Sequence, residues 1–173
     1  ESRRLSEIEI LLLHRISATE WKDRLFVRGI RGKGSAGTYR PQLENLQRGT
    51  LVYADRNYTF TGIPEALAGA THIRTHNDDK GNTEAEFLHF EINLPATLYL
   101  AYDGRSKPPE ALVDGMQKTS MAVRMSNGES FPVYRRTVPT GKITLGGNKQ
   151  GGAGGESMYQ VFLTKTGLRK TNI

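Results

Sequence analysis

Apolar and polar residues alternate along much of the chain from Leu51 onward, with the period of two that is typical of half-buried β-strands. The segment 87–94 shows this most clearly, because apolar residues fill its even positions while His89, Glu91 and Asn93 lie between them. Comparable segments occupy 51–53, 58–61, 71–75, 87–94, 97–102, 121–125, 131–138, 143–145 and 158–164. They are short and closely spaced, so we expect an all-β protein, an antiparallel β-sandwich of the jelly-roll type with short helical turns.

Turn signals separate the expected strands. Asn127-Gly128 predicts a hairpin with a two-residue type I′ turn, which requires positive backbone angles at both residues. Pro64 and Gly69 bracket a single predicted helical turn, since proline is tolerated in the first turn and glycine ends helices. Residues 108–112 predict a second short helical turn.

The first 47 residues have a different texture. Residues 5–16 place apolar side chains at helical spacing and include a possible capping box, so we expect a short helix, with a strand as the alternative. Residues 28–41 contain four glycines and four basic residues in fourteen positions, a composition that cannot bury a core of its own and predicts a loop or arm. We therefore expect a basic N-terminal segment over 1–47 and a β-sandwich domain over 48–173.

The net charge of +6 is concentrated near the N-terminus. Residues 1–49 hold ten Lys and Arg against six Asp and Glu, whereas residues 50–173 hold fourteen against twelve. We expect no nucleic-acid partner, because the sequence has no recognised nucleic-acid motif and its basic residues are not interleaved with stacking aromatics. The basic segment is instead expected to dock on a larger protein complex. The candidate contact residues are Trp21, Arg28, Arg31, Lys33 and Arg40.

Composition excludes several classes of protein. Cysteine is absent, which rules out disulfides, thiolate catalysis and cysteine-ligated zinc. No apolar run approaches the roughly 18–20 residues of a membrane-spanning helix, so we expect no membrane span. The first residue is Glu1 rather than Met, which fits a processed exported chain or a shortened one, and the strand-rich pattern favours export.

Five blocks of sequence carry a resemblance to a known group of proteins. They are Tyr-Ala-Asp-Arg-Asn-Tyr-Thr-Phe at 53–60, Ile-Arg-Thr-His-Asn-Asp-Asp-Lys at 73–80, Tyr-Leu-Ala-Tyr-Asp-Gly-Arg at 99–105, Thr-Leu-Gly-Gly-Asn at 144–148 and Ser-Met-Tyr-Gln-Val at 157–161. In order and spacing they resemble the non-catalytic β-sandwich accessory modules of secreted bacterial polysaccharide-degrading and other extracellular enzymes, over about residues 48–165. The resemblance implies an exported module, secreted or periplasmic, with carbohydrate binding as its leading function.

A saccharide site needs polar groups that bind paired hydroxyls and an aromatic face for stacking. In the modules that the chain resembles, the blocks at 77–80 and 102–105 recur together, although His76 and Gly104 depart from the usual pattern. An anionic ligand would pair with the Arg and Lys side chains of these blocks through a carboxylate or sulfate. The candidate ligand-binding residues are Arg74, Asn77, Asp78, Asp79, Lys80, Tyr102, Asp103 and Arg105, with Tyr53, Tyr58 and Tyr99 as further aromatic platforms.

The same residues have a purely structural interpretation, which stays open. The aspartates at 78–79 suit the capping of a turn. The Asp–Arg pairs within 55–56 and 103–105 suit ion pairs that brace loops at the sheet edge.

We expect no catalytic residues, no cofactor and no transition metal. His72 and His76 share one face of an expected strand, but no third ligand stands at a recognised spacing. A calcium ion held by the block 77–79 is the alternative, since calcium prefers such carboxylate and amide oxygens. The glycine-rich stretches 29–37 and 146–155 lack the Gly-Lys-Ser/Thr ending of nucleotide-binding loops and predict flexible connections or arms.

Two functions follow from these observations. The first is a non-catalytic, carbohydrate-binding or accessory module. The second is a structural subunit of a larger extracytoplasmic protein complex, docking through the basic N-terminal segment.

Overall fold

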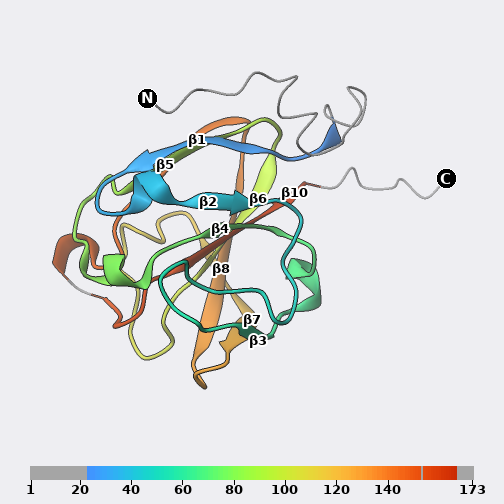
Figure 1. Cartoon of the computed structure of the whole chain (residues 1–173). Helices are drawn as coiled ribbons and strands as arrows, with labels where there is room; N and C mark the ends of the chain where they lie inside the picture. Colours follow the sequence, from blue (N-terminus) through green and yellow to red (C-terminus); the bar gives the residue numbers. More distant parts are fainter. Residues whose placement is uncertain (1–22, 153, 167–173) are drawn as a thin grey trace.

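The computed structural model describes residues 23–152 and 154–166, which form two antiparallel β-sheets around one hydrophobic core (Figure 1). The three-stranded sheet has the order β1 (Val27–Gly32), β5 (Leu88–Ile92), β9 (Gly141–Leu145). The seven-stranded sheet, which curls into a half-barrel, has the order β2 (Arg40–Gln42), β4 (Thr71–Arg74), β10 (Gln160–Lys165), β6 (Ala96–Ala101), β8 (Ser130–Val138), β7 (Gln117–Met125), β3 (Phe60–Gly62). The 3₁₀ turns are η1 (Ala36–Thr38), η2 (Glu65–Leu67), η3 (Asn77–Gly81) and η4 (Gln150–Gly152). The predicted all-β sandwich is confirmed.

The core explains why the strands sit in one register. In β5 the alternation places Leu88, Phe90 and Ile92 in the core while His89 and Glu91 are only half-buried, as the sequence pattern predicts. Burial of one such apolar side chain stabilises the fold by roughly 1.5–3 kcal/mol. A one-residue slip would exchange the two faces, so the core fixes the pairing and with it the loops at the strand ends.

The prediction of a loop or arm over 28–41 is wrong. This segment contains β1, η1 and β2, with β1 paired to β5 and β2 paired to β4. Strands from elsewhere in the chain supply the hydrogen bonds that its own composition could not. Its glycines allow close approach, since a Cβ at Gly32 would collide with the carbonyl oxygen of Phe87. Both strands therefore share their sheets with strands that follow residue 48, whereas the helix expected over 5–16 lies outside the described residues.

The hairpin predicted at Asn127-Gly128 joins β7 to β8, but its turn type differs from the expected one. Met125 N donates to Glu129 O at 3.0 Å and Gly128 N donates to Met125 O at 3.0 Å, so the loop has the three residues 126–128. Within it only Gly128 has a positive φ, +88°. This is a three-residue loop with a glycine bulge, whereas a type I′ turn needs positive φ at both central residues.

The remaining local expectations hold in part. The helical turn between Pro64 and Gly69 is present as η2, while 108–112 forms hydrogen-bonded turns without a helix. The expected strand over 51–53 reduces to isolated bridges. None of the helical segments among the described residues has the length and apolar character that a membrane crossing would need.

Candidate functional site

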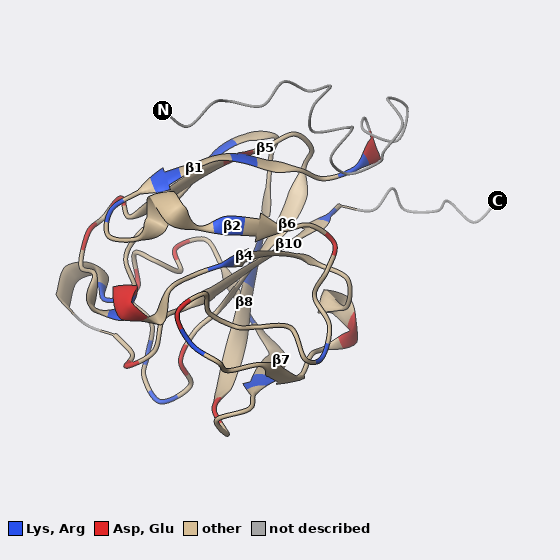
Figure 2. Cartoon of the chain, in the orientation of Figure 1, with Lys and Arg blue, Asp and Glu red and all other residues tan. Residues whose placement is uncertain are grey.

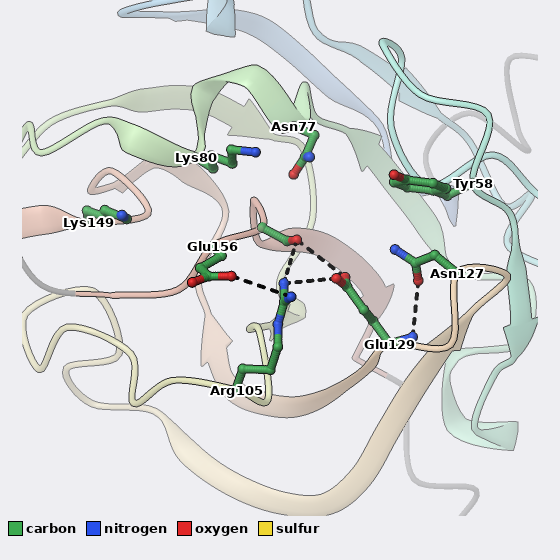
Figure 3. Close-up of a pocket in the computed structure, with 9 residues that line it drawn as sticks. Tyr58, Asn77, Lys80, Arg105, Asn127, Glu129, Lys149 and Glu156 are labelled. Atoms are coloured by element: carbon green, nitrogen blue, oxygen red, sulfur yellow. Dashed lines mark hydrogen bonds and ion pairs between the residues drawn. The ribbon is translucent and has the colours of Figure 1, made fainter.

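An open polar pocket of about 470 Å³ lies where loops from both halves of the chain meet, a size within the ordinary range for small-ligand sites (Figure 3). Its walls come from the approach to β3, from η3, from the loop after β6, from the β7–β8 hairpin and from the loop between β9 and β10. The lining residues are Tyr58, Asn77, Lys80, Arg105, Asn127, Glu129, Lys149, Glu156 and Ser157.

Arg105 lies at the floor of the pocket and forms an ion pair with the buried carboxylate of Asp103. Its Nε and Nη2 donate to the two oxygens of Asp103 at 3.0 and 2.8 Å, and its backbone N also donates to Asp103 at 3.0 Å. The backbone N–H groups of Glu156 and Ser157 donate to the same carboxylate at 3.1 and 3.0 Å. Burial alone raises the pKa of Asp103, but these hydrogen bonds and the Arg105 charge outweigh it and hold the pKa below its ordinary value.

Two further carboxylates meet the outer side of Arg105. Its Nη2 lies 2.8 Å from Glu129 Oε1, and its Nη1 lies 3.6 Å from Glu156 Oε2. Ser157 Oγ accepts from Arg105 Nη2 at 3.0 Å and donates to Glu129 at 3.3 Å. The hydrogen bond to Asp103, followed by the charges of all three acids, raises the pKa of Arg105. Its positive charge is therefore already compensated, and Arg105 serves to hold acceptor oxygens at the pocket surface.

The opposite wall carries two lysines of a different kind. Lys80 lies in the last turn of η3 and Lys149 precedes η4, and both residues are half-buried. Neither makes an ion pair with any residue in the described part of the chain. Figure 3 shows these two lysines on one side of the pocket, with Tyr58 and Asn127 on the other. The pocket thus has a donor-rich wall and an acceptor-rich floor.

Asn148 ties these walls together from inside the protein. It is fully buried, and its Nδ2 donates to Lys80 O at 3.1 Å and to Ser157 O at 3.0 Å. Its Oδ1 accepts from Tyr159 N at 3.0 Å, while its own carbonyl accepts from the Tyr102 hydroxyl at 2.6 Å. Since buried polar groups are costly to leave unpaired, this network keeps the lysine wall and the Ser157 segment in fixed relation.

The turn η3, which carries Asn77 and Lys80, is held in place by residues from other segments of the chain. Asp55 accepts from the backbone N–H groups of Asn77 and Asp78 at 2.8 and 3.0 Å, and Arg56 pairs with Asp78 at 2.6 Å. Asn77 Oδ1 accepts from Met158 N at 2.9 Å. The block 53–60 thus braces the block 73–80.

The structure brings together only some of the predicted ligand-binding residues. Asn77, Lys80 and Arg105 line the pocket, and Asp103 supports it from below. The other four predicted residues do not line it. Asp79 accepts hydrogen bonds from the Tyr39 hydroxyl and Ser35 N, and Tyr102 is buried. Asp78 is exposed beside Arg56, and Arg74 lies on β4 away from the pocket lining.

Sequence reasoning did not single out Glu129, Lys149, Glu156 or Ser157 for this pocket. Their loops have no periodic pattern, and only the folded sheets bring them together. Two features of the sequence indicated loops that line the pocket. Asn127-Gly128 predicted the hairpin tip, and the glycine-rich stretch 146–155 predicted the loop that carries Lys149. Tyr58 is half-buried and is the only aromatic candidate that lines the pocket, since the expected platforms Tyr53 and Tyr99 are buried.

The residues predicted to bind a partner lie away from the pocket. Arg28 and Arg31 are exposed on β1, Lys33 follows them, and Arg40 in β2 donates to the carbonyl oxygens of Thr38 and Tyr39 (Figure 2). Arg28 also pairs with a carboxylate of β5 at 3.2 Å. Trp21 lies outside the described residues.

No group of three or more His, Asp or Glu side chains arranged to hold a metal ion occurs within residues 23–152 and 154–166. In the block 77–79, which was the calcium alternative, both oxygens of Asp79 already accept hydrogen bonds and Asn77 Oδ1 is paired with Met158 N.

Comparisons with known proteins agree with this architecture, although no family model matches the chain. Over 110 residues, 63% of the chain, it is 28% identical to the beta-glucuronidase of Formosa agariphila. It superimposes on a solved beta-glucuronidase from glycoside hydrolase family 2 with a TM-score of 0.71 and 25% identity over 80% of the chain. The chain is similar to one part of glycoside hydrolases. It spans 11% of the first enzyme and 14% of the second.

A third likeness concerns the fold alone. A GH138 enzyme targeting pectin rhamnogalacturonan II matches 84% of this chain with a TM-score of 0.58 and 15% identity, and the match covers 17% of that enzyme. The two beta-glucuronidase likenesses are consistent with a domain of a carbohydrate-active enzyme, as the five blocks predict.

Proposed function

We propose that this chain is a non-catalytic β-sandwich module of an exported carbohydrate-active enzyme, and that the pocket around Arg105 binds a saccharide. The observation that carries the proposal is the composition of the pocket: hydroxyl-binding acceptors on Glu129 and Glu156, donors on Asn77 and two lysines, and the half-buried ring of Tyr58. Saccharide hydroxyls donate and accept at once, and sugar rings stack on aromatic faces, so this mixture suits them.

The contacts of Glu129 support a binding role over hydrolysis. Glycoside hydrolysis with paired carboxyl groups needs one of them protonated as the general acid. Glu129 pairs with Arg105 at 2.8 Å and accepts from Ser157, contacts that suit a carboxylate. The chain also spans only 11–14% of the two beta-glucuronidases, which leaves the bulk of those enzymes to supply their activity.

Affinity electrophoresis through gels that contain neutral or acidic polysaccharides tests this proposal. We expect the intact chain to be retarded by at least one polysaccharide, and Tyr58→Ala to weaken that binding by about tenfold because it removes the stacking face. Tyr134→Ala is the matched control, since Tyr134 is also a half-buried tyrosine packed on the core but does not line the pocket. Migration unaffected by every polysaccharide would contradict the proposal.

A second candidate is assembly on an acidic surface of a larger protein. It is favoured by the exposed Arg28 and Arg31 on β1, an edge strand of the three-stranded sheet, and by the exposed Lys33 that follows it. Replacement of these three residues by Glu should abolish co-elution with that larger protein in size-exclusion chromatography. High salt should have the same effect, because it screens the charges. Unchanged co-elution after charge reversal would remove this candidate.

A further inference from the structure

We infer that the pocket selects saccharides that carry an anionic group, a carboxylate or a sulfate, which Lys80 and Lys149 bind. This inference rests on the proposed saccharide binding and names the class of sugar.

The first argument is the charge balance inside the pocket. Arg105 is surrounded by Asp103, Glu129 and Glu156, at 2.8, 2.8 and 3.6 Å. The pocket's other two cations, Lys80 and Lys149, have no ion-pair partner among the described residues. The three carboxylates gather around the arginine and equal the pocket's three cations in number, but none of them pairs with either lysine, so the two ammonium groups are the cations left for a bound anion.

The second argument is the position of these lysines. Both residues are half-buried beside the pocket, and among the described residues no carboxylate lies within ion-pair distance of their ammonium groups. Their backbones are nonetheless held in place: Lys80 O accepts from buried Asn148, and Lys149 N donates to Asn82 O at 2.9 Å. A scaffold that fixes the backbones of two unpaired lysines beside one pocket suits the binding of an anion there.

The third argument is the polarity of the pocket as a whole. Figure 3 places the lysines on one side, Tyr58 on the other, and Glu129 and Glu156 with Arg105 below. A sugar ring stacked on Tyr58 can present hydroxyl donors to the two glutamates and its anionic substituent to the lysines. A neutral sugar would satisfy the glutamates but leave the lysine wall unpaired.

Calorimetry with a matched pair of ligands tests the inference. The probes are a uronic-acid oligosaccharide, the same oligosaccharide after reduction of its carboxylates to hydroxymethyl groups, and a sulfated neutral oligosaccharide. We expect the intact chain to bind at least one of the two anionic probes about tenfold or more tightly than the reduced one, with an affinity that falls as salt rises. Which anionic probe binds distinguishes a carboxylate ligand from a sulfate ligand.

Variants locate the effect. Lys80→Met and Lys149→Met should each weaken binding of the anionic probe by about three- to tenfold while leaving the reduced probe unchanged. Lys142→Met is the control, because Lys142 is an exposed lysine on β9 outside the pocket. Equal affinity for reduced and anionic probes, unaltered in both lysine variants, would overturn the inference and leave saccharide binding intact. Absence of binding to all three probes, with no retardation by any polysaccharide, would overturn the proposed function as well.

Discussion

Asp103 and Arg105 form a bidentate ion pair in which one partner is buried and the other faces the pocket. The Asp103 side chain is 1% exposed and the Arg105 side chain 49%, with Nη2 2.8 Å from the carboxylate. Because Asp103 also accepts two backbone N–H groups from 156–157, it links the guanidinium to the segment that carries Glu156 and Ser157. The pair therefore fixes the position of the pocket's acceptor groups relative to the end of β6.

Asp103→Asn should destabilise the protein by about 2–4 kcal/mol, measured by urea unfolding at pH 7. The amide offers one acceptor oxygen where the carboxylate offers two, and its NH₂ would face the N–H donors of Arg105 or of Glu156 and Ser157. Asp78→Asn is the control, because Asp78 pairs with Arg56 at the exposed surface; its effect should be much smaller. Equal losses in the two variants would contradict the role given to Asp103.

Asn148→Ala should lower the free energy of unfolding by about 2–4 kcal/mol and should also abolish saccharide binding. The truncation leaves Tyr159 N and the carbonyl oxygens of Lys80 and Ser157 without the partner that now satisfies them. Thermal unfolding and affinity electrophoresis measure the two effects. Asn127→Ala, at the exposed hairpin tip, should change stability by less than about 1 kcal/mol. Unaltered stability of Asn148→Ala would show that the buried amide does not organise the pocket.

Gly155→Ala tests the close approach of two pocket segments. A Cβ at Gly155 would lie 2.7 Å from the Cβ of Asp103, so the segment that carries Glu156 must shift. We expect a loss of about 1–3 kcal/mol and a roughly tenfold weaker saccharide affinity by calorimetry. Gly37→Ala is the control, since a Cβ there has open space within 4 Å. Wild-type affinity in Gly155→Ala would refute the tight packing.

The alternation of apolar residues was enough to predict most of the sandwich, because strands such as β5 and β9 each bury one face. It failed for β1, whose single buried position, Val27, gives no period to detect. That strand exists because β5 pairs with it, at positions about sixty residues away in the sequence. The composition of the β1 segment itself therefore gives no sign of its pairing partner.

The pocket was predictable only where polar residues cluster in sequence. The blocks at 77–80 and 102–105 gave Asn77, Lys80 and Arg105, but they also suggested Asp79 and Tyr102, which the fold turns inward. Asp79 is engaged by the Tyr39 hydroxyl from a segment expected to be an arm. Whether a polar side chain faces a ligand or a buried partner depends on long-range packing, which a single sequence does not encode locally.

His72 is buried against two aromatic rings and should make stability depend on pH. Its ring centroid lies 5.5 Å from that of Phe60 and 5.2 Å from that of Phe162, and neither ring nitrogen has a hydrogen-bond partner among the described residues. Burial, aided by the charge of Arg74, lowers the pKa of His72 to about 3. In the unfolded chain an ordinary histidine has a pKa of about 6.5. Between these values the unfolded state binds a proton that the native state does not.

Stability is therefore fully present above about pH 6.5 and should fall by about 1.4 kcal/mol per pH unit as the pH decreases toward 3. In His72→Phe, the new ring packs against Phe60 and Phe162 and carries no proton, so the free energy of unfolding of this variant should vary less between pH 6.5 and 4.5. In urea unfolding over that window, the lowered pKa of Asp103 contributes only below about pH 5 and does so equally in wild type and variant, so it cancels in their difference. His89→Phe, at a half-buried position on β5, is the matched control and should keep the wild-type slope. Parallel curves for wild type and His72→Phe would mean that His72 takes up a proton in the native state as readily as in the unfolded chain, and would contradict the prediction.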